Sequence, residues 1–309
     1  MHDQTDAGAT LRRLMPAAAA ALSLMLAWAA AAAHETPVQT ADSAAAAAFH
    51  EWHTVPHPAA AEPRVVGTYT NGCVAGAAAL PADGAGYQVI RMSRNRYWGH
   101  PELIRFLQDF GREVEAAGIG ADGTGVLAIG DLAQPRGGPM PSGHASHETG
   151  LDADVWLRLD LPRLSFAARE GLEGVSVVDT DAWRVNGHFT DETATVIRLA
   201  ASDPRVERIF VHPAIKRAMC ERRWDDRSFL KTVRPWFGHI GHMHVRIGCP
   251  AGSPDCTPQA PPPPGDGCGA ELASWFPDPN RPPAPAAPQA DRPPPPPLPV
   301  QCAAVLGME

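Results

Sequence analysis

The sequence of 309 residues has no block of lysine or arginine, and this lack limits the partners that the protein can bind. Its formal net charge is -8 at pH 7. Domains that bind nucleic acid usually gather positive charge on one face to meet the phosphates. The glycine-rich residues 134–143 also lack the pattern GxxxxGK[ST] of a phosphate-binding loop. We therefore expect no nucleic-acid partner and no phosphate-binding loop.

The N-terminal segment indicates the compartment. Arg12 and Arg13 precede an uncharged, alanine-rich stretch, residues 14–33, which ends in a small-residue cleavage pattern. This arrangement is typical of a secretory signal peptide. An uncleaved membrane anchor is the alternative, but alanine contributes little transfer energy into lipid. We expect residues 1–33 to be removed, and no membrane contact after the cleavage.

The cysteines include no C-x-x-C pair, which argues against a cysteine zinc site. Six of them in an exported chain favour three disulfides. Cys249 and Cys256 flank a short loop and are candidates for a local pair. Cys302 lies beyond a proline-rich run, so we expect it to tie the end of the chain to the body, with Cys73 as the candidate partner. A free or intermolecular thiol at Cys302 is the alternative.

The rest of the sequence divides into three parts. Residues 34–62 lack hydrophobic periodicity and are expected to be a flexible lead-in. Residues 277–309 are expected to be a proline-rich tail tethered through Cys302, with an extended conformation over the proline-dominated residues 277–299. Residues 63–276 lie between them, and about 210 residues are enough for one domain with a hydrophobic core.

Strands and helices alternate irregularly through this body. Hydrophobic patterns predict strands over 87–92, 125–132, 151–159, 206–212 and 242–248, and helices over 101–117, 191–201 and 213–223. The first and last of these helices begin with proline, which suits the first turn. Because no regular βαβ repeat occurs, we expect an α+β fold. It would have a small, mainly antiparallel sheet that carries a metal site, flanked by helices and disulfide-stapled loops.

The predicted strand 242–248 has two chemically different faces. Side chains alternate across a strand, so His242 and His244 share one face with Arg246, while Met243 and Val245 point the other way. We expect the apolar face to be buried. Two imidazoles then project together on the opposite face, as metal ligands or catalytic groups would.

A second polar cluster, SGHASHETGLDADVW, occupies residues 142–156. His147 lies in its loop and Asp154 lies on the strand that follows. With one histidine of the strand 242–248, they would supply two nitrogens and one oxygen, a typical catalytic zinc set that leaves a position for water. A structural zinc more often has four protein ligands, commonly cysteines.

Two other catalytic patterns are incomplete. Glu148 has the register of neither H-E-x-x-H nor H-x-x-E-H, so it lacks the place of the catalytic glutamate in those zinc peptidases. Ser228 and Lys231 match S-x-x-K, but the partner motifs S-D-N and K-T-G of penicillin-binding enzymes are absent. The sequence therefore favours a metal over a serine nucleophile.

Further stretches extend the two clusters into long, ordered motifs. They are PWFGHIGHMHVRIGCP (235–250), TNGCVAGA (70–77), RYWGHPEL (96–103), FVHPAIKRAMC (210–220) and GDGCGAELASWF (265–276). Together they cover the body, and they resemble the penicillin-insensitive murein endopeptidases. This family is part of a zinc superfamily with lysostaphin-type, D-alanyl-D-alanine and hedgehog-like domains.

The resemblance implies a zinc ion held by His147, Asp154 and His244, with His242 and His239 beside it in catalytic or substrate-binding roles. It also implies the reaction: water activated by zinc would hydrolyse the amide between D-alanine and diaminopimelate that cross-links peptidoglycan in the periplasm. A non-catalytic, zinc-containing module that only binds murein is the alternative, because hedgehog-like relatives include such binders. Nothing in the sequence indicates an oligomeric state.

The resemblance bears on three more features. Family members carry further metal contacts, for which His144 is a good match and Asp181 a weak one. Residues 174–189 depart from the family pattern, so a second metal is not assigned. The resemblance also implies a third disulfide, between Cys220 and Cys268.

Overall fold

The computed structural model describes residues 50–120, 126–140, 146–277 and 296–308. The expected signal peptide, residues 1–33, and the candidate ligand His144 lie outside the described residues. Within the described ranges, no helix combines the length and the apolar character needed to span a membrane.

Strands and helices follow one another along the chain in an irregular order. The strands are β1 Arg64–Thr68, β2 Asn71–Ala75, β3 Ala78–Ala79, β4 Asp83–Gly84, β5 Tyr87–Val89, β6 Trp98–Gly99, β7 Leu127–Ile129, β8 Asp152–Trp156, β9 Val178–Asp179, β10 Arg184–Val185, β11 Val206–Val211, β12 Val233–Pro235 and β13 His242–Ile247. The helices are η1 Met92–Arg94, α2 Pro101–Ala116, α3 Phe166–Glu170, α4 Asp191–Ser202, α5 Pro213–Glu221, η3 Ser228–Lys231, α6 Ala270–Ala273 and α7 Val300–Gly307.

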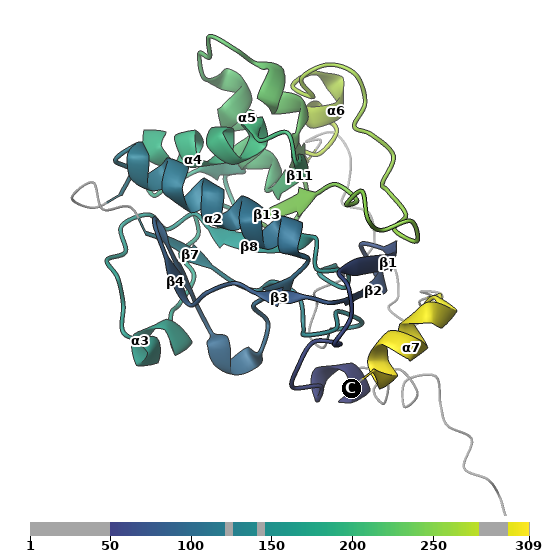
Figure 1. The fold of residues 1–309 in the computed structure, drawn as a ribbon. Coiled ribbons are helices and arrows are strands. Elements are labelled where there is room, and N and C mark those ends of the chain that lie inside the picture. Colours follow the sequence, from purple (N-terminus) through teal and green to yellow (C-terminus); the bar gives the residue numbers. More distant parts are fainter. Residues whose placement is uncertain (1–49, 121–125, 141–145, 278–295, 309) are drawn as a thin grey trace, which may run out of the picture. The chain divides into compact units, whose positions relative to one another are not determined.

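The central sheet has seven strands in the order β12-β11-β13-β8-β7-β5-β4. Only the pairs β11–β12 and β5–β7 are parallel, so the sheet is mainly antiparallel. The α+β class is therefore confirmed. Strands β13 and β8 lie at the centre of the sheet, which gives any site built on them a rigid base (Figure 1).

Helices α2 and α4 lie on one side of this sheet (Figure 1). Helix α2 begins at Pro101, as predicted, and the side chain of His100 caps it by accepting a hydrogen bond from the Glu102 amide. Apolar residues of both helices, such as Phe106 and Ile197, are buried in one core with Met243 and Val245 of β13. The apolar face of β13 is thus buried, as the alternation predicted.

Three predicted strands are clearly shorter than expected. The range 125–132, whose residue 125 lies outside the described residues, contains only β7; 151–159 contains only β8; and 87–92 contains only β5. The pattern 87–92 continues past Val89, but Arg91 has φ +53° and Asn95 has φ +53°, and the short helix η1 lies between them. A left-handed conformation is costly for side chains with a Cβ, and extended strand pairing cannot continue through it. The apolar pattern did not predict this turn, which points two arginines toward the site described below.

The three disulfides join Cys73 to Cys302, Cys220 to Cys268 and Cys249 to Cys256. All three predicted pairs are therefore confirmed, and the free thiol at Cys302 is excluded.

The C-terminal helix α7 packs on the hairpin of β1 and β2. Cys302 and Val305 are buried there with Val66 and with Trp52, which is 3% exposed. Trp52 belongs to the stretch expected to be a flexible lead-in, so this part of the stretch packs on the body. Gly138 permits the contact, because a Cβ at its φ of +73° would lie 2.2 Å from the Trp52 ring.

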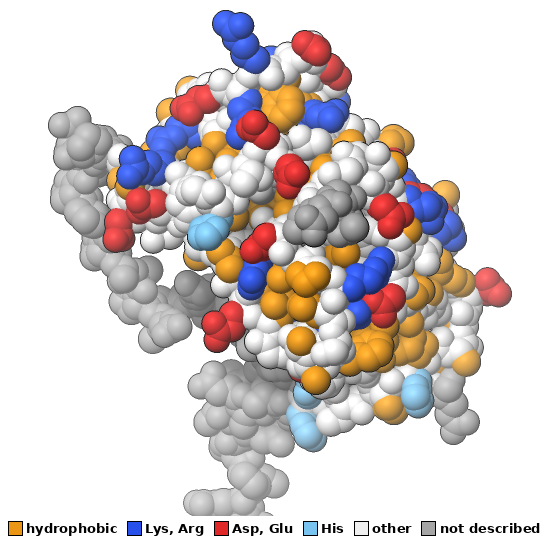
Figure 2. Space-filling view, turned by 90° about the vertical axis from the view of Figure 1, so that its left-hand side faces the viewer, with side chains coloured by type: hydrophobic (Ala, Val, Ile, Leu, Met, Phe, Trp, Pro, Cys, Tyr) orange, Lys and Arg blue, Asp and Glu red, His pale blue; other side chains and the backbone are white. Residues whose placement is uncertain are grey.

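Acidic and basic side chains are interspersed on the face drawn in Figure 2, and neither sign forms a large patch there.

Candidate metal centre

The site is built on two neighbouring strands. In the antiparallel pair of β8 and β13, Asp154 lies opposite His244 and Trp156 lies opposite His242. Directly opposed residues share one face of a sheet, with Cβ atoms about 4.5–5.5 Å apart. The apolar residues of β13 face the core, so the polar side chains of both strands gather on the other face.

His147, Asp154 and His244 meet on this face. One ligand atom from each residue can be chosen so that all three lie within 4.8 Å of one another. Asp154 Oδ1 is 3.2 Å from His244 Nδ1 and 3.5 Å from His147 Nε2. All three side chains are buried. It is the one group of this kind in the part of the chain that the structure describes, and it is the set that the sequence predicted.

His147 reaches the group from a constrained loop. Its φ is +73°, a conformation that non-glycine residues seldom adopt and that often marks functional sites. Its amide donates a hydrogen bond to Asp152 Oδ2, at 3.3 Å. Gly137 packs against the next residue, since a Cβ at Gly137 would lie 1.9 Å from the Glu148 carbonyl oxygen. These contacts fix the loop before Asp154.

The Oδ1 atom of Asp154 is the polar centre of the site. It is buried and receives no hydrogen bond of normal geometry from the described residues, although three imidazoles surround it. Burial alone raises the pKa of this carboxyl, but its electrostatic interactions with the neighbouring His147 and His242 outweigh that effect and hold the pKa well below its usual value. A buried, ionised oxygen in such surroundings suits a cation.

Asp152 is a site residue that sequence reasoning missed. It is fully buried, and its Oδ1 lies 2.9 Å from His244 Nε2 and accepts a hydrogen bond of 2.7 Å from Arg246 Nε. Burial lowers the pKa of His244, but Asp152 and Asp154 outweigh it and raise that pKa to about 9. The alternation in LDADVW could have revealed Asp152, because it places Asp152 on the same face as Asp154.

His242 and His239 border the group, as predicted. His242 Nε2 is 3.7 Å from Asp154 Oδ1, and its side chain is 34% exposed. The ring of His239 lies 5.1 Å from the ring of His242, and His239 Nδ1 is 3.0 Å from the Phe237 carbonyl oxygen. Burial lowers the pKa of both histidines, that of His239 to about 4, so both favour the neutral form.

Asp181, the weak candidate ligand, and Ser228, the serine of the S-x-x-K match, both lie away from the metal group. Asp181 is exposed in the turn between β9 and β10 and does not belong to the group of His147 and Asp154. Ser228 is also exposed, and its hydroxyl donates a hydrogen bond of 2.7 Å to Asp226 Oδ2. The S-x-x-K match therefore forms no nucleophile–base pair with Lys231 in the structure.

Two cavities adjoin the metal group. One, of about 190 Å³, is lined by Ser146, Phe210, Trp236, His239 and His244 among others. The other, of about 340 Å³, is lined by the residues Arg91, Arg94, Asp131, Asp154, Trp156 and His242 among others. The histidines thus lie between two open spaces, an arrangement that lets an extended ligand pass across them.

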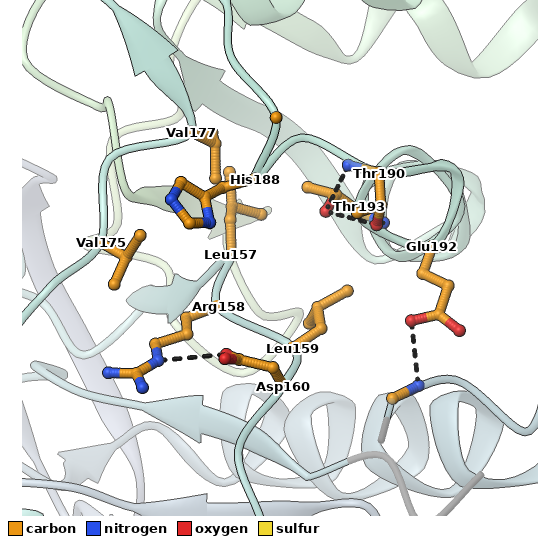
Figure 3. Close-up of a pocket in the computed structure, with 12 residues that line it drawn as sticks. Leu157, Arg158, Leu159, Asp160, Val175, Val177, His188, Thr190, Glu192 and Thr193 are labelled. Carbon is orange, nitrogen blue, oxygen red and sulfur yellow. Dashed lines mark hydrogen bonds and ion pairs between the residues drawn. The ribbon is translucent and has the colours of Figure 1, made fainter. Parts of the chain in front are cut away.

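A third cavity, of about 430 Å³, lies beside the first turn of α4 and contains none of the predicted site residues. In Figure 3, His188 and Leu157 face this cavity, and Arg158 pairs with Asp160 at its edge. Val175 lines both this cavity and the one beside Asp154.

Comparison with known proteins identifies the family. The model of the family described as penicillin-insensitive murein endopeptidase matches residues 65–307. The penicillin-insensitive murein endopeptidase of Haemophilus influenzae is 48% identical over 234 residues, which cover 74% of this chain and 80% of the relative. The proteins of that name from Klebsiella pneumoniae and Salmonella newport are each 43% identical over 265 residues, which cover 85% of this chain and 93% of each relative. The chain therefore belongs to the family of penicillin-insensitive murein endopeptidases.

Proposed function

We propose that this protein is a zinc-dependent murein endopeptidase that hydrolyses the amide between D-alanine and meso-diaminopimelate in peptidoglycan cross-links. The observation that carries the proposal is the convergence of His147, Asp154 and His244 on one buried point. The family assignment supports the same reading, because the relatives are named as murein endopeptidases.

The donor set fits zinc. Two imidazole nitrogens and one carboxylate oxygen form a common three-ligand set of catalytic zinc sites, which keep a fourth position open. The buried Oδ1 of Asp154, which lacks a hydrogen bond from the described residues, is the kind of atom that a cation would satisfy. When bound, zinc supplies Lewis-acid chemistry, because it polarises a carbonyl group and lowers the pKa of water.

Asp152, on the other side of His244 from Asp154, orients the His244 ring for zinc binding. Asp152 accepts a hydrogen bond from His244 Nε2, so Nδ1, on the side of Asp154, is the nitrogen that would give up its proton and bind zinc. A carboxylate behind a metal-binding histidine is a common arrangement that fixes the tautomer and raises the basicity of the ligand. Arg246 in turn neutralises Asp152 and holds it in place.

His242 and His239 are the candidates for proton transfer. Both favour the neutral form near pH 7, so each can accept a proton. The Phe237 carbonyl oxygen near His239 Nδ1 favours a proton on that nitrogen, which leaves His239 Nε2 as the acceptor. His242 Nε2 is the nearer atom to Asp154, and we assign it the larger share of the proton transfer.

The proposed substrate implies the location. Peptidoglycan lies outside the cytoplasmic membrane, so the enzyme acts there, and we propose the periplasm as the compartment and residues 1–33 as the removed signal peptide. A partner other than the peptides of the cross-link is not needed for this reaction.

Digestion of purified murein tests the proposal. The enzyme is incubated with cross-linked muropeptide dimers, and the products are separated by chromatography and weighed by mass spectrometry. We expect dimers to become monomers with new D-alanyl carboxyl and diaminopimelyl amine ends. Dimers that stay intact while they bind to the protein would favour the murein-binding module instead.

A further inference from the structure

The cavity of about 340 Å³ beside Asp154 and His242 has a basic wall that the reaction described above does not use. Arg91 and Arg94 line it, and both come from the turn around η1. The two cations lie next to a candidate active site in a protein whose net charge is -8. This position suggests a ligand with a negative charge.

Arg94 is only partly neutralised within the cavity. Its Nη1 atom lies 3.3 Å from Asp131 Oδ2, and its side chain is 41% exposed. The same oxygen accepts a shorter bond of 2.9 Å from Arg96, whose side chain is 7% exposed. The charge of Asp131 is therefore met by the buried Arg96, so the exposed guanidinium of Arg94 adds positive charge to the cavity wall.

Arg91 is held above Trp156, the residue that pairs with His242 in the sheet. Its Cζ atom lies 4.9 Å from the centre of the Trp156 ring, and its Nη2 donates a hydrogen bond of 2.9 Å to the Leu172 carbonyl oxygen. Trp156 donates its indole N–H to the Gly130 carbonyl oxygen, at 3.1 Å. Trp156 lies directly opposite His242 in the sheet, so Arg91 is two side chains away from the proposed proton carrier.

The turn that carries both arginines is held in place. The amide and the hydroxyl of Ser93 donate hydrogen bonds to the two carboxylate oxygens of Glu170, at 3.0 and 2.5 Å. The side chain of Asn95 accepts a hydrogen bond of 2.8 Å from the indole N–H of Trp98 and donates one of 3.4 Å to the Val55 carbonyl oxygen. Binding a ligand would therefore require little ordering of the backbone.

The backbone at Asp131, the partner of Arg94, is hydrogen-bonded to the strand that carries Asp154. The Asp154 amide donates a hydrogen bond to the Asp131 carbonyl oxygen, and the Gly130 amide donates to the Asp154 carbonyl oxygen, each at 3.0 Å. The backbone that carries Asp131 is thus paired with the strand that carries Asp154. Arg94, which pairs with Asp131, therefore lines the same cavity as Asp154 from the neighbouring segment.

We propose that Arg94 and Arg91 form a subsite for the carboxylate that the diaminopimelyl residue carries on the same carbon as the amide nitrogen of the cross-link. This inference rests on the proposed function, because it assigns the leaving-group side of that substrate. Arginine binds carboxylates through charge-assisted hydrogen bonds that also fix orientation. Arg94 supplies the exposed guanidinium, and Arg91 adds charge behind it.

The first test compares two substrates and four proteins. The substrates are a muropeptide dimer with the free carboxylate and the same dimer with that carboxylate amidated. The proteins are wild type, Arg94→Gln, Arg94→Lys and the control Arg105→Gln, an exposed arginine on α2 that pairs with Glu102. Zinc content and circular dichroism must match wild type for each variant.

We expect Arg94→Gln to lower kcat/KM for the free-acid dimer by about 10- to 100-fold, the usual range for a hydrogen bond to a charged group. It should change kcat/KM for the amidated dimer little, and Arg94→Lys should recover part of the loss. Arg105→Gln should match wild type with both dimers. An equal loss with both substrates, or no loss with either, would overturn the subsite.

A binding measurement separates this inference from the proposed function. The amine-side product, a murein peptide with a free diaminopimelyl amine and carboxylate, is titrated calorimetrically into wild type and Arg94→Gln without any turnover. Weaker binding to the variant supports the subsite even if the wild type cleaves no dimer, in which case the proposed reaction fails alone. Equal binding to both proteins contradicts the subsite even if cleavage is observed.

Discussion

At the scale of the residue, Asp154 Oδ1 organises the site. His244 Nδ1, His147 Nε2 and His242 Nε2 lie 3.2, 3.5 and 3.7 Å from this single oxygen. Their exposure separates their roles, because His147 and His244 are buried whereas a third of the His242 side chain reaches solvent. The two buried histidines suit metal binding, and the accessible one suits contact with substrate.

This division predicts different outcomes for two substitutions on one strand face. His244→Ala should lose most of the bound zinc, because it removes a ligand, and should lose activity as a result. His242→Ala should keep its zinc and still lose about 100- to 10,000-fold in kcat, the usual range for a general acid or base. Elemental analysis gives the zinc content, and chromatography of cleaved dimers gives the rate.

Circular dichroism that matches wild type is the control for both variants, since each alters a central strand. Equal loss of zinc in the two variants would contradict the division of roles. Full activity in His242→Ala would instead make His239 the proton carrier.

Asp152 gives a second prediction at this scale. In Asp152→Asn the amide would hold the His244 ring less well and would leave Arg246 without its carboxylate partner. We expect zinc affinity to fall by about 10- to 100-fold, as for other residues that support a ligand from behind. A competitive chelator titration measures the affinity, and Asp160→Asn on the exposed loop is the control. Unchanged affinity in Asp152→Asn would show that Arg246 and the strand suffice to hold His244.

The sequence predicted the ligands better than their supports. Spacing and alternation predicted His147, Asp154 and one histidine of HMHVRI, and the family resemblance selected His244, which the structure brings together with the other two. Asp152 was missed because its partners, His244 and Arg246, are 92 and 94 residues away in the sequence. Contacts of that kind depend on the register of β8 with β13, which periodicity alone does not give.

At the scale of the element, strands with a clear two-residue period and helices with a proline start were predicted well. Strand β13 and helices α2 and α5 begin at the predicted residues. The end of β5 was not predicted, because the apolar run of YQVIRM continues while the backbone turns at Arg91. Hydrophobic periodicity cannot detect a left-handed residue without glycine or asparagine to mark it.

At the scale of the whole molecule, the bridge between Cys73 and Cys302 joins residues 229 positions apart and fastens α7 to the hairpin of β1 and β2. Arg136 reinforces the contact, because its Nη1 donates a hydrogen bond of 3.2 Å to the Val305 carbonyl oxygen. The even number of cysteines, and the place of Cys302 beyond the proline-rich run, predicted that this disulfide ties the end of the chain to the body. The burial of Trp52 beside it was not predicted, since one aromatic residue in an alanine-rich stretch creates no period.

Replacement of both cysteines, Cys73→Ser with Cys302→Ser, should lower the free energy of unfolding by about 2–4 kcal/mol, because the unfolded chain gains freedom. Urea unfolding followed by circular dichroism measures the change. The matched control, Cys249→Ser with Cys256→Ser, opens a loop of only 7 positions and should cost less. A larger loss in the control pair would contradict the role given to the tail.

The most direct test of the account is the metal dependence of cleavage. The protein is stripped with a chelator, its residual metal is measured by elemental analysis, and cross-linked muropeptide dimers are added before and after one equivalent of zinc. We predict that cleavage disappears with the metal, returns with zinc, and is unchanged by penicillin or by Ser228→Ala. Cleavage that continues without metal, or that penicillin or Ser228→Ala abolishes while zinc is bound, would contradict the assignment of His147, Asp154 and His244 as the catalytic metal site.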